Sequence, residues 1–348
     1  MTVLALPALR SHDPLGVLAA LGLFEIAKSC LHLPEDELAL GWDGVGGPAL
    51  FGSPIDDVEE LADQLFRLAV RTHESGAALA LGGPDLLPER RSKAETAALK
   101  AAGVAVRNEP LEVSREVAVA QWSSVQEAEL AGDHTAARWL AGLVNQMSVD
   151  RNSRFCELTP LRAARGQQTL RQVYRKQLAE VASRPDLLRE ALLGWRRRPG
   201  VVGANLDWRE IRDATVEPSG DARDVAIPGA TWLALHAFPW FRLGGTTSSP
   251  FAIGWALARG SDEAFVWPVW RSPLGAEGIQ VLLEHRLVRV AALNDEERPA
   301  DVDRRLAVLG VEAVFVSRRG RLMNAKGPLG RPELRWPRRP PAARRSAA

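Results

Sequence analysis

The sequence predicts an α+β protein, with a helix-rich N-terminal half and a mixed α/β C-terminal half. Two observations support this prediction. In the first half, apolar residues recur at helical spacing behind aspartates that can cap a helix. In the second half, runs rich in aromatic and β-branched residues, at 251–258 and 265–270, indicate strands between helices. The chain has 348 residues, 46% of them apolar and 25% charged, which is typical of a globular protein.

The clearest expected helix follows Asp13 and Pro14. Asp13 can accept hydrogen bonds from the free amides of the first turn, and Pro14 suits the first helical position because it lacks an N–H. Residues 15–26 are almost all apolar, which indicates a helix surrounded by protein. Gly16 and Gly22 are poor helix formers, so their presence predicts that another backbone passes close by.

The other elements are predicted from the spacing of apolar residues and from the positions of glycine and proline. Residues 111–120 alternate weakly and predict a strand, and 311–316 predict another. Helices are expected at 58–68 (starting at Asp56 or Asp57), 133–147, 167–181, 185–194, 276–287 and 301–309, with a further apolar segment at 228–238.

The charged residues are strongly segregated, although the net charge is only +1. The balance is −11 over 1–150, +7 over 151–213, −4 over 214–316 and +9 over 317–348. We therefore expect an acidic helix-rich lobe over 1–150, a basic and then mixed α/β lobe over 151–330, and a disordered tail rich in arginine and proline over 331–348. The positive charge falls in two blocks, so the small net charge does not exclude an anionic partner.

Several classes of protein fit the sequence poorly. Cys30 and Cys156 suit a reducing compartment and provide neither a disulfide framework nor a cysteine-based zinc site. The apolar run at 15–26 is too short to span a bilayer and lacks the features of a signal peptide, so we expect a cytoplasmic protein without membrane contact.

Motifs for catalysis or cofactor binding are also missing from the sequence. The glycines at 44–47 neither follow a convincing strand nor open a helix, and the nucleophile motifs G-x-S-x-G and S-x-x-K do not occur. We therefore expect no catalytic residues, no cofactor and no metal. His12 and Asp13 can alternatively be a metal-binding doublet of a nuclease, but the other histidines are scattered and helix capping explains Asp13 better.

Arginine gives the most promising chemical signal. Planar guanidinium groups match phosphate bidentately, and an adjacent indole offers a stacking surface for an unpaired base. The predicted nucleic-acid contacts are Arg162, Arg165, Arg171, Arg175, Lys176, Trp195, Arg196, Arg197 and Arg198. Tyr174 can stack on a base or belong to the core. The alternative for the arginines is that they pair with the acidic first 150 residues.

Five short blocks occur in an order that resembles proteins of type I-G (formerly I-U) CRISPR loci. Two families open similarly: the large-subunit-like proteins and, as the closer match, a family named as an extension of the helicase-nuclease. The blocks are HDPLGVLAALGL at 12–23, GQQTL at 166–170, LDWR at 206–209, PGATWLAL at 228–235 and FVWPVW at 265–270, followed by Pro273 and Leu274.

The resemblance implies a component or accessory of a crRNA-guided DNA-targeting complex in antiviral defence. The implied partners are crRNA or target DNA and the other effector proteins, including the helicase-nuclease. Base pairing reads the sequence in such systems, so this chain would hold nucleic acid or effector subunits. Two other roles stay open: a protein-binding adaptor without nucleic-acid contact, and a metal-dependent nuclease that uses His12 and Asp13.

Overall fold

A computed structural model gives the structure of the chain. It describes residues 1–77, 97–98, 101–102, 113–132, 134–149, 155–162, 170–201, 203–210, 225–257, 263–292, 301–322 and 325–337. Arg165, most of the GQQTL block and the end of the expected tail (338–348) lie outside these ranges. Within the described ranges, no helix combines the length and the apolar character needed to cross a bilayer.

Helices and strands are both abundant, so the predicted α+β class is confirmed. The helices are α1 (Pro14–Ser29), α2 (Val58–Glu74), α4 (Arg115–Leu130), α5 (Thr135–Leu143), α6 (Leu170–Ser183), α7 (Asp186–Leu193), α9 (Pro228–Leu235), α10 (Ala276–Glu284), α11 (Arg286–Ala291) and α12 (Val302–Val308). Short 3-10 turns lie at η1 (Glu35–Glu37) and η3 (Phe238–Trp240).

The strands form small antiparallel sheets. They are β1 (Thr2–Arg10), β2 (Ala39–Trp42), β3 (Pro48–Ser53), β4 (Val144–Val149), β5 (Cys156–Leu158), β6 (Arg198–Pro199), β7 (Val225–Ala226), β8 (Leu243–Thr246), β9 (Ser249–Ala252), β10 (Trp255–Leu257), β11 (Glu263–Trp270), β12 (Val311–Leu322), β13 (Ala325–Leu329) and β14 (Glu333–Trp336). One sheet has the order β1-β3-β2, and a larger one has the order β10-β11-β12-β13 with β14 also paired to β12. The pairs β4–β5, β6–β7 and β8–β9 are separate two-stranded antiparallel sheets.

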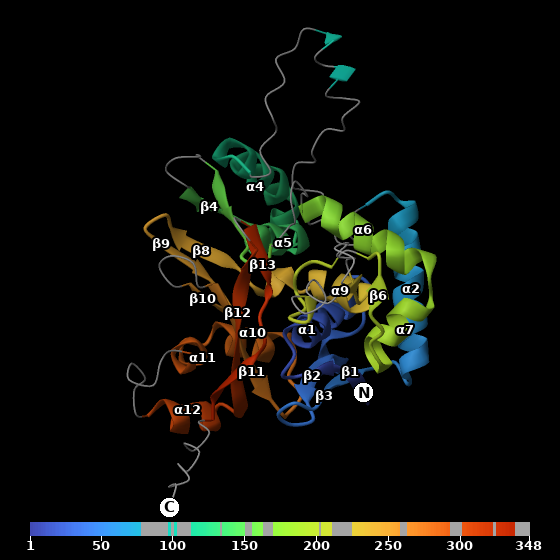
Figure 1. Ribbon diagram of the computed structural model, residues 1–348, viewed down its shortest axis with the longest axis vertical. Coiled ribbons are helices and arrows are strands. Elements are labelled where there is room, and N and C mark those ends of the chain that lie inside the picture. Colours follow the sequence, from blue (N-terminus) through green and yellow to red (C-terminus); the bar gives the residue numbers. More distant parts are fainter. Residues whose placement is uncertain are drawn as a thin grey trace, which may run out of the picture.

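Helix α1 lies near the middle of the molecule, as its apolar composition predicts (Figure 1). It packs against α9, while α2, α6 and α7 contact one another or α9 on one side of this pair. The larger sheet lies on the other side, and α10, α11 and α12 contact its strands. Positions 14–27 of α1 are all buried.

The start of α1 confirms the predicted cap. The Asp13 carboxylate accepts a hydrogen bond from the Leu15 amide at 3.1 Å, and Pro14 occupies the first turn. Close backbone approach at the two glycines is also confirmed. A Cβ on Gly22 would overlap the carbonyl oxygen of Leu233 in α9, and a Cβ on Gly16 would lie 2.7 Å from the Arg10 amide nitrogen.

The structure corrects three local predictions. Residues 115–120 begin α4 instead of forming a strand, because Ala118 and Val125 face the core at helical spacing. Helix α5 ends at Leu143, so Met147 lies on β4 and not on a helical stripe. Residues 333–336, expected in the disordered tail, form β14, whose Trp336 is buried against β12.

A single hydrophobic core includes residues of both expected lobes, from Leu4 in β1 to Trp336 in β14. Hydrogen bonds also join distant segments inside it. The indole of Trp267 in β11 donates to the Ser11 carbonyl at 2.9 Å, and the indole of Trp270 donates to the Leu40 carbonyl at 2.7 Å. The N-terminal segment is therefore packed directly against the C-terminal sheet.

A fully buried histidine in this core gives a pH-dependent stability. His236 follows α9, and its Nδ1 lies 2.8 Å from the Trp232 carbonyl. Burial lowers the pKa of His236 to about 4, although the hydrogen bond to Trp232 partly opposes this. The unfolded chain binds the proton at the ordinary pKa of about 6.5. The contribution of neutral His236 to the free energy of unfolding is therefore fully present above about pH 6.5. It is lost progressively as the pH falls from about 6.5 to about 4.

We expect the free energy of unfolding to fall by about 1.4 kcal/mol per pH unit in that window, beyond the contribution of the carboxylates. Replacing His236→Gln should remove this part of the slope, whereas His73→Gln, at an exposed position of α2, should leave it unchanged. Denaturant unfolding at a series of pH values measures both slopes. Equal slopes for the wild type and His236→Gln would contradict the account.

Candidate functional site

Two tryptophans and four arginines gather where α7 ends. We call this group the arginine–tryptophan patch: Trp195, Arg196, Arg197, Arg198, Trp208 and Arg209. The Arg209 guanidinium lies over both indoles, 4.9 Å from the ring centroid of Trp208 and 5.7 Å from that of Trp195. The Trp195 indole donates to the Ala191 carbonyl at 3.0 Å, which fixes the ring against α7. The patch therefore presents planar groups at fixed positions.

Arg196, Arg197 and Arg198 each pair with a carboxylate that is more buried than the arginine, and Arg198 also pairs with the more exposed Asp186. Arg197 pairs with Asp207 at 2.8 Å, and their side chains are 24% and 3% exposed. Glu190 of α7 is 14% exposed and pairs with Arg198 at 2.7 Å and with the 75% exposed Arg196 at 3.6 Å. The guanidinium groups thus form the more exposed side of the ion pairs with Asp207 and Glu190.

Arg209 connects the patch to the start of α1. It pairs with Asp13 at 2.7 Å and with Asp207 at 3.2 Å, and both carboxylates are almost fully buried. Burial raises the pKa of Asp13, and the positive charge of Arg209 only partly offsets this. Burial lowers the pKa of Arg209, but its two carboxylate partners outweigh this and raise it. Asp13 therefore has two structural roles, as helix cap and as ion-pair partner.

The surroundings of His12 and Asp13 do not support the alternative that these two residues bind a metal ion. Asp13 already contacts Leu15 and Arg209. Among the residues that the structure describes, no group of three histidine, cysteine, aspartate or glutamate side chains is arranged to hold a metal ion.

The remaining predicted arginines lie elsewhere. Arg171, Arg175 and Lys176 are on α6, with Lys176 exposed and the two arginines half-buried. The Arg175 guanidinium points to the Gly76 carbonyl at 3.5 Å, just past the C-terminal end of α2, where a positive charge is favourable. Arg162 is half-buried after β5, and Arg165 lies outside the described residues.

Tyr174 belongs to the core, which was one of the two alternatives for it. Its side chain is fully buried and its hydroxyl donates to the Leu235 carbonyl at 2.6 Å. Its ring makes edge contacts with Trp139 and Phe238. Tyr174 is therefore not placed to stack on a base.

The expected pairing between the basic block and the acidic first half occurs in part. Arg189 of α7 pairs with Glu59 of α2 at 2.6 Å, and Arg209 pairs with Asp13. The three consecutive arginines at 196–198 instead pair with carboxylates of their own segment.

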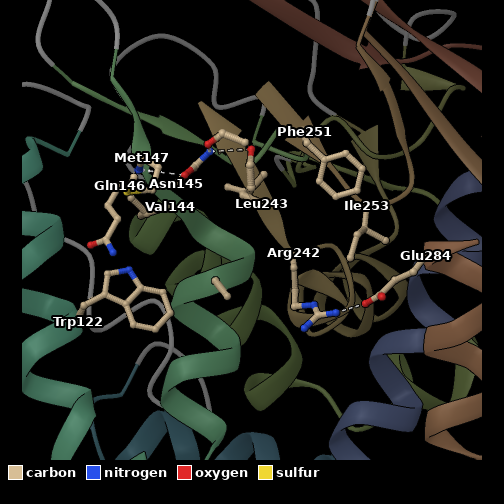
Figure 2. Close-up of a pocket in the computed structure, with 13 residues that line it drawn as sticks. Trp122, Val144, Asn145, Gln146, Met147, Arg242, Leu243, Phe251, Ile253 and Glu284 are labelled. Atoms are coloured by element: carbon tan, nitrogen blue, oxygen red, sulfur yellow. Dashed lines mark hydrogen bonds and ion pairs between the residues drawn. The ribbon is translucent and has the colours of Figure 1, made fainter. Parts of the chain in front are cut away.

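A groove forms a second candidate site, on the side of the molecule where α4, β4, β8, β9 and α10 meet. Its volume is about 520 Å³. Figure 2 shows Trp122, Gln146 and Met147 on one side and Phe251, Arg242 and Glu284 on the other. Nothing in the sequence motifs indicated this groove, because its lining residues come from five separated segments.

The segments that carry the CRISPR resemblance meet in the structure. Block 12–23 forms the cap and most of α1, which packs on block 228–235 in α9. Block 206–209 contacts the first block through the Arg209–Asp13 ion pair, and block 265–270 bonds the residue just before it through the hydrogen bond from Trp267 to Ser11. These four blocks are therefore connected to one another, whereas most of the GQQTL block lies outside the described residues.

Comparison with models of known protein families and with curated proteins gives no match. The predicted residues Trp195 and Arg196–Arg198 lie together in the structure, and Trp208 and Arg209, which were not predicted, belong to the same group. The signal for these two was present, because both lie in the LDWR block.

Proposed function

We propose that this chain is a non-catalytic component of a type I-G CRISPR effector complex, active in antiviral defence. In this role it contacts crRNA or target DNA through the arginine–tryptophan patch and binds other effector subunits, among them the helicase-nuclease. Base pairing with the guide supplies sequence specificity, so the chain needs only to hold the nucleic-acid backbone and an unpaired base.

One observation carries the proposal. Three of the blocks that resemble the type I-G families, at 12–23, 206–209 and 265–270, meet at or just before the start of α1, and Arg209 joins this point directly to the patch. Arg209 thus belongs to the LDWR block, to the buried ion-pair network and to the group that it forms with the half-buried Trp195 and Trp208. This convergence supports a shared role for the patch in proteins of this type.

The patch has features that suit a single strand. Planar arginines bind phosphate bidentately, and indoles stack on bases of any sequence. Asp207 and Glu190 hold Arg197 and Arg198 in place, so little side-chain entropy is lost when a phosphate binds. The same carboxylates cancel part of the positive charge, so we expect moderate affinity and contact with only a few phosphates.

The expected result is preferential binding of single-stranded DNA or RNA over duplex DNA of the same sequence. About three phosphate contacts to a single strand give a slope of about −2 in a plot of log affinity against log salt concentration, so affinity should fall roughly tenfold or more between about 50 and about 200 mM salt. Fluorescence anisotropy with labelled oligonucleotides measures this. Binding without salt dependence would contradict phosphate contact by the patch.

A protein-binding adaptor without nucleic-acid contact is the second candidate. It is favoured by the local pairing of the patch arginines, since Arg198 contacts both Glu190 and, at 3.0 Å, Asp186. In that case, the carboxylates neutralise the patch and no oligonucleotide binds at either salt concentration. The titration therefore separates the two candidates.

A further inference from the structure

Arg209 differs from the other arginines of the patch in how much of its guanidinium group is already engaged. One terminal nitrogen, Nη2, pairs with the Asp13 carboxylate at 2.7 Å, and the other, Nη1, donates to the Asp207 carboxylate at 3.2 Å. The backbone amide of Arg209 also donates to Asp207, at 3.0 Å. Main chain and side chain of Arg209 are therefore tied to the same buried carboxylate, which fixes the orientation of the guanidinium plane.

The same guanidinium group lies against both tryptophans of the patch. Its distances of 4.9 Å to the ring centroid of Trp208 and 5.7 Å to that of Trp195 are within the range of cation–π attraction. The Trp195 ring is held a second time, by the hydrogen bond from its indole to the Ala191 carbonyl. Both tryptophans are half-buried, so part of each side chain is open to solvent, and Arg209 fixes where that part lies.

These contacts make Arg209 poorly suited to bind phosphate. An anion that approached its guanidinium group would also meet the carboxylates of Asp13 and Asp207, which already pair with it. Arg196 is different, because its side chain is 75% exposed and lies 3.6 Å from the carboxylate of Glu190. Phosphate contact therefore suits the exposed arginine, whereas Arg209 can influence a ligand through the two rings that it supports.

From these observations we propose that Arg209 is a positioning residue for an unpaired base and not a phosphate contact. The inference rests on the nucleic-acid contact proposed above for the patch. Arg209 holds Trp195 and Trp208 so that the exposed parts of their rings contact a base, while Arg196 contacts the backbone. The two buried carboxylates act one step further back, because they fix Arg209 itself.

The variant Arg209→Lys separates the contact with a base from the contact with phosphate. It keeps a positive charge beside the two carboxylates, but an ammonium group is a compact charge without a plane that can lie over two rings. The tryptophans then lose their common support, whereas the phosphate contacts remain. Arg196→Lys is the matched control, because it makes the same chemical change at the most exposed arginine of the patch.

Two single strands of equal length measure the base contact: a deoxythymidine oligonucleotide and an abasic strand with the same phosphates. We expect the wild type to bind the thymidine strand at least about fivefold more tightly, because a stacked base contributes a factor of that size or more. Arg209→Lys should reduce this preference to about twofold or less, with the wild-type slope of log affinity against log salt concentration. Arg196→Lys should weaken both strands by the same factor and keep the preference.

Asp207→Asn tests the same point with Arg209 itself unchanged, which matters if Arg209→Lys does not fold. One end of an asparagine amide is a donor, so it cannot accept from both Arg209 and Arg197 as the carboxylate does. The preference is a ratio of two affinities for strands with the same phosphates, so changes at Arg197 cancel in it. We expect Asp207→Asn to reduce the preference, as Arg209→Lys does.

The possible outcomes distinguish this inference from the proposed function. If the wild type binds neither strand, the proposed function is refuted and the role of Arg209 with it. If the wild type binds both strands equally and in a salt-dependent way, the phosphate contact stands and the role of Arg209 is overturned. The same role is overturned if Arg209→Lys or Asp207→Asn keeps the wild-type preference, or if Arg209→Lys has a shallower salt slope. A merely structural effect would weaken both strands by the same factor and would leave the preference unchanged.

Discussion

Replacing Gly22→Ala is expected to destabilise the protein by about 3 kcal/mol or more. The added Cβ would overlap the carbonyl oxygen of Leu233, lie 2.7 Å from its carbonyl carbon and lie 3.2 Å from the Ala237 amide nitrogen. All three atoms are backbone, so α1 and α9 would have to move apart in a core that is packed on every side. Denaturant unfolding measures the loss.

Gly278→Ala is the matched control, because Gly278 also lies in a helix, α10. Its added Cβ would meet only side-chain atoms of Leu274 at 3.3 Å or more. Alanine is the better helix former by about 1 kcal/mol, so we expect the control to unfold within about 1 kcal/mol of the wild type. If both variants lost the same stability, the close crossing of α1 and α9 would be wrong.

Removal of the Asp13 carboxylate should have the second large effect. Asp13→Ala deletes the helix cap and leaves the Arg209 charge with one buried partner fewer. A lost helix cap costs about 0.5–2 kcal/mol and a lost hydrogen bond to a charged group about 1.5–3 kcal/mol, and Arg209 is 33% exposed and keeps Asp207, so we expect the free energy of unfolding to fall by about 2–4 kcal/mol. Asp13→Asn should cost less, because it keeps a side-chain oxygen that can accept from the Leu15 amide and from Arg209.

The control for the ion pair is Arg305→Ala, which breaks an exposed pair with Asp301 on α12. Exposed pairs contribute little, so its unfolding midpoint should match that of the wild type. Urea unfolding of the wild type, Asp13→Ala, Asp13→Asn and Arg305→Ala measures these differences in stability. An Asp13→Ala variant as stable as the wild type would show that the buried network is not important for the fold.

The sequence predicts the regular elements of this fold where local signals are strong. Asp13 and Asp57 each cap the helix that was expected behind them, and the two glycines of α1 indicate its close neighbours. The error at 115–120 has a physical cause. Alternating valines favour a strand locally, whereas the core contacts of Ala118 and Val125 follow helical spacing and decide the structure.

The candidate sites were harder to predict, because they depend on contacts between residues far apart in the chain. Consecutive residues such as Arg196, Arg197 and Arg198 stay together in any fold, so their grouping could be read from the sequence. The contact between Arg209 and Asp13 joins positions far apart in the chain, and the groove collects residues from Trp122 to Glu284. Neither leaves a local pattern. Tyr174 lies between Arg171 and Arg175 in a basic helix, yet its side chain belongs to the core.

The affinity of single-stranded oligonucleotides for two charge-reversal variants tests the central claim most directly. Arg196→Glu changes the most exposed arginine of the patch, and Arg305→Glu changes a 60% exposed arginine on α12. We predict that Arg196→Glu raises the dissociation constant at least tenfold and reduces the slope of log affinity against log salt concentration by about 1. Both quantities should keep their wild-type values in Arg305→Glu. Equal affinity of the two variants, or no binding by the wild type, would contradict a nucleic-acid contact through the arginine–tryptophan patch.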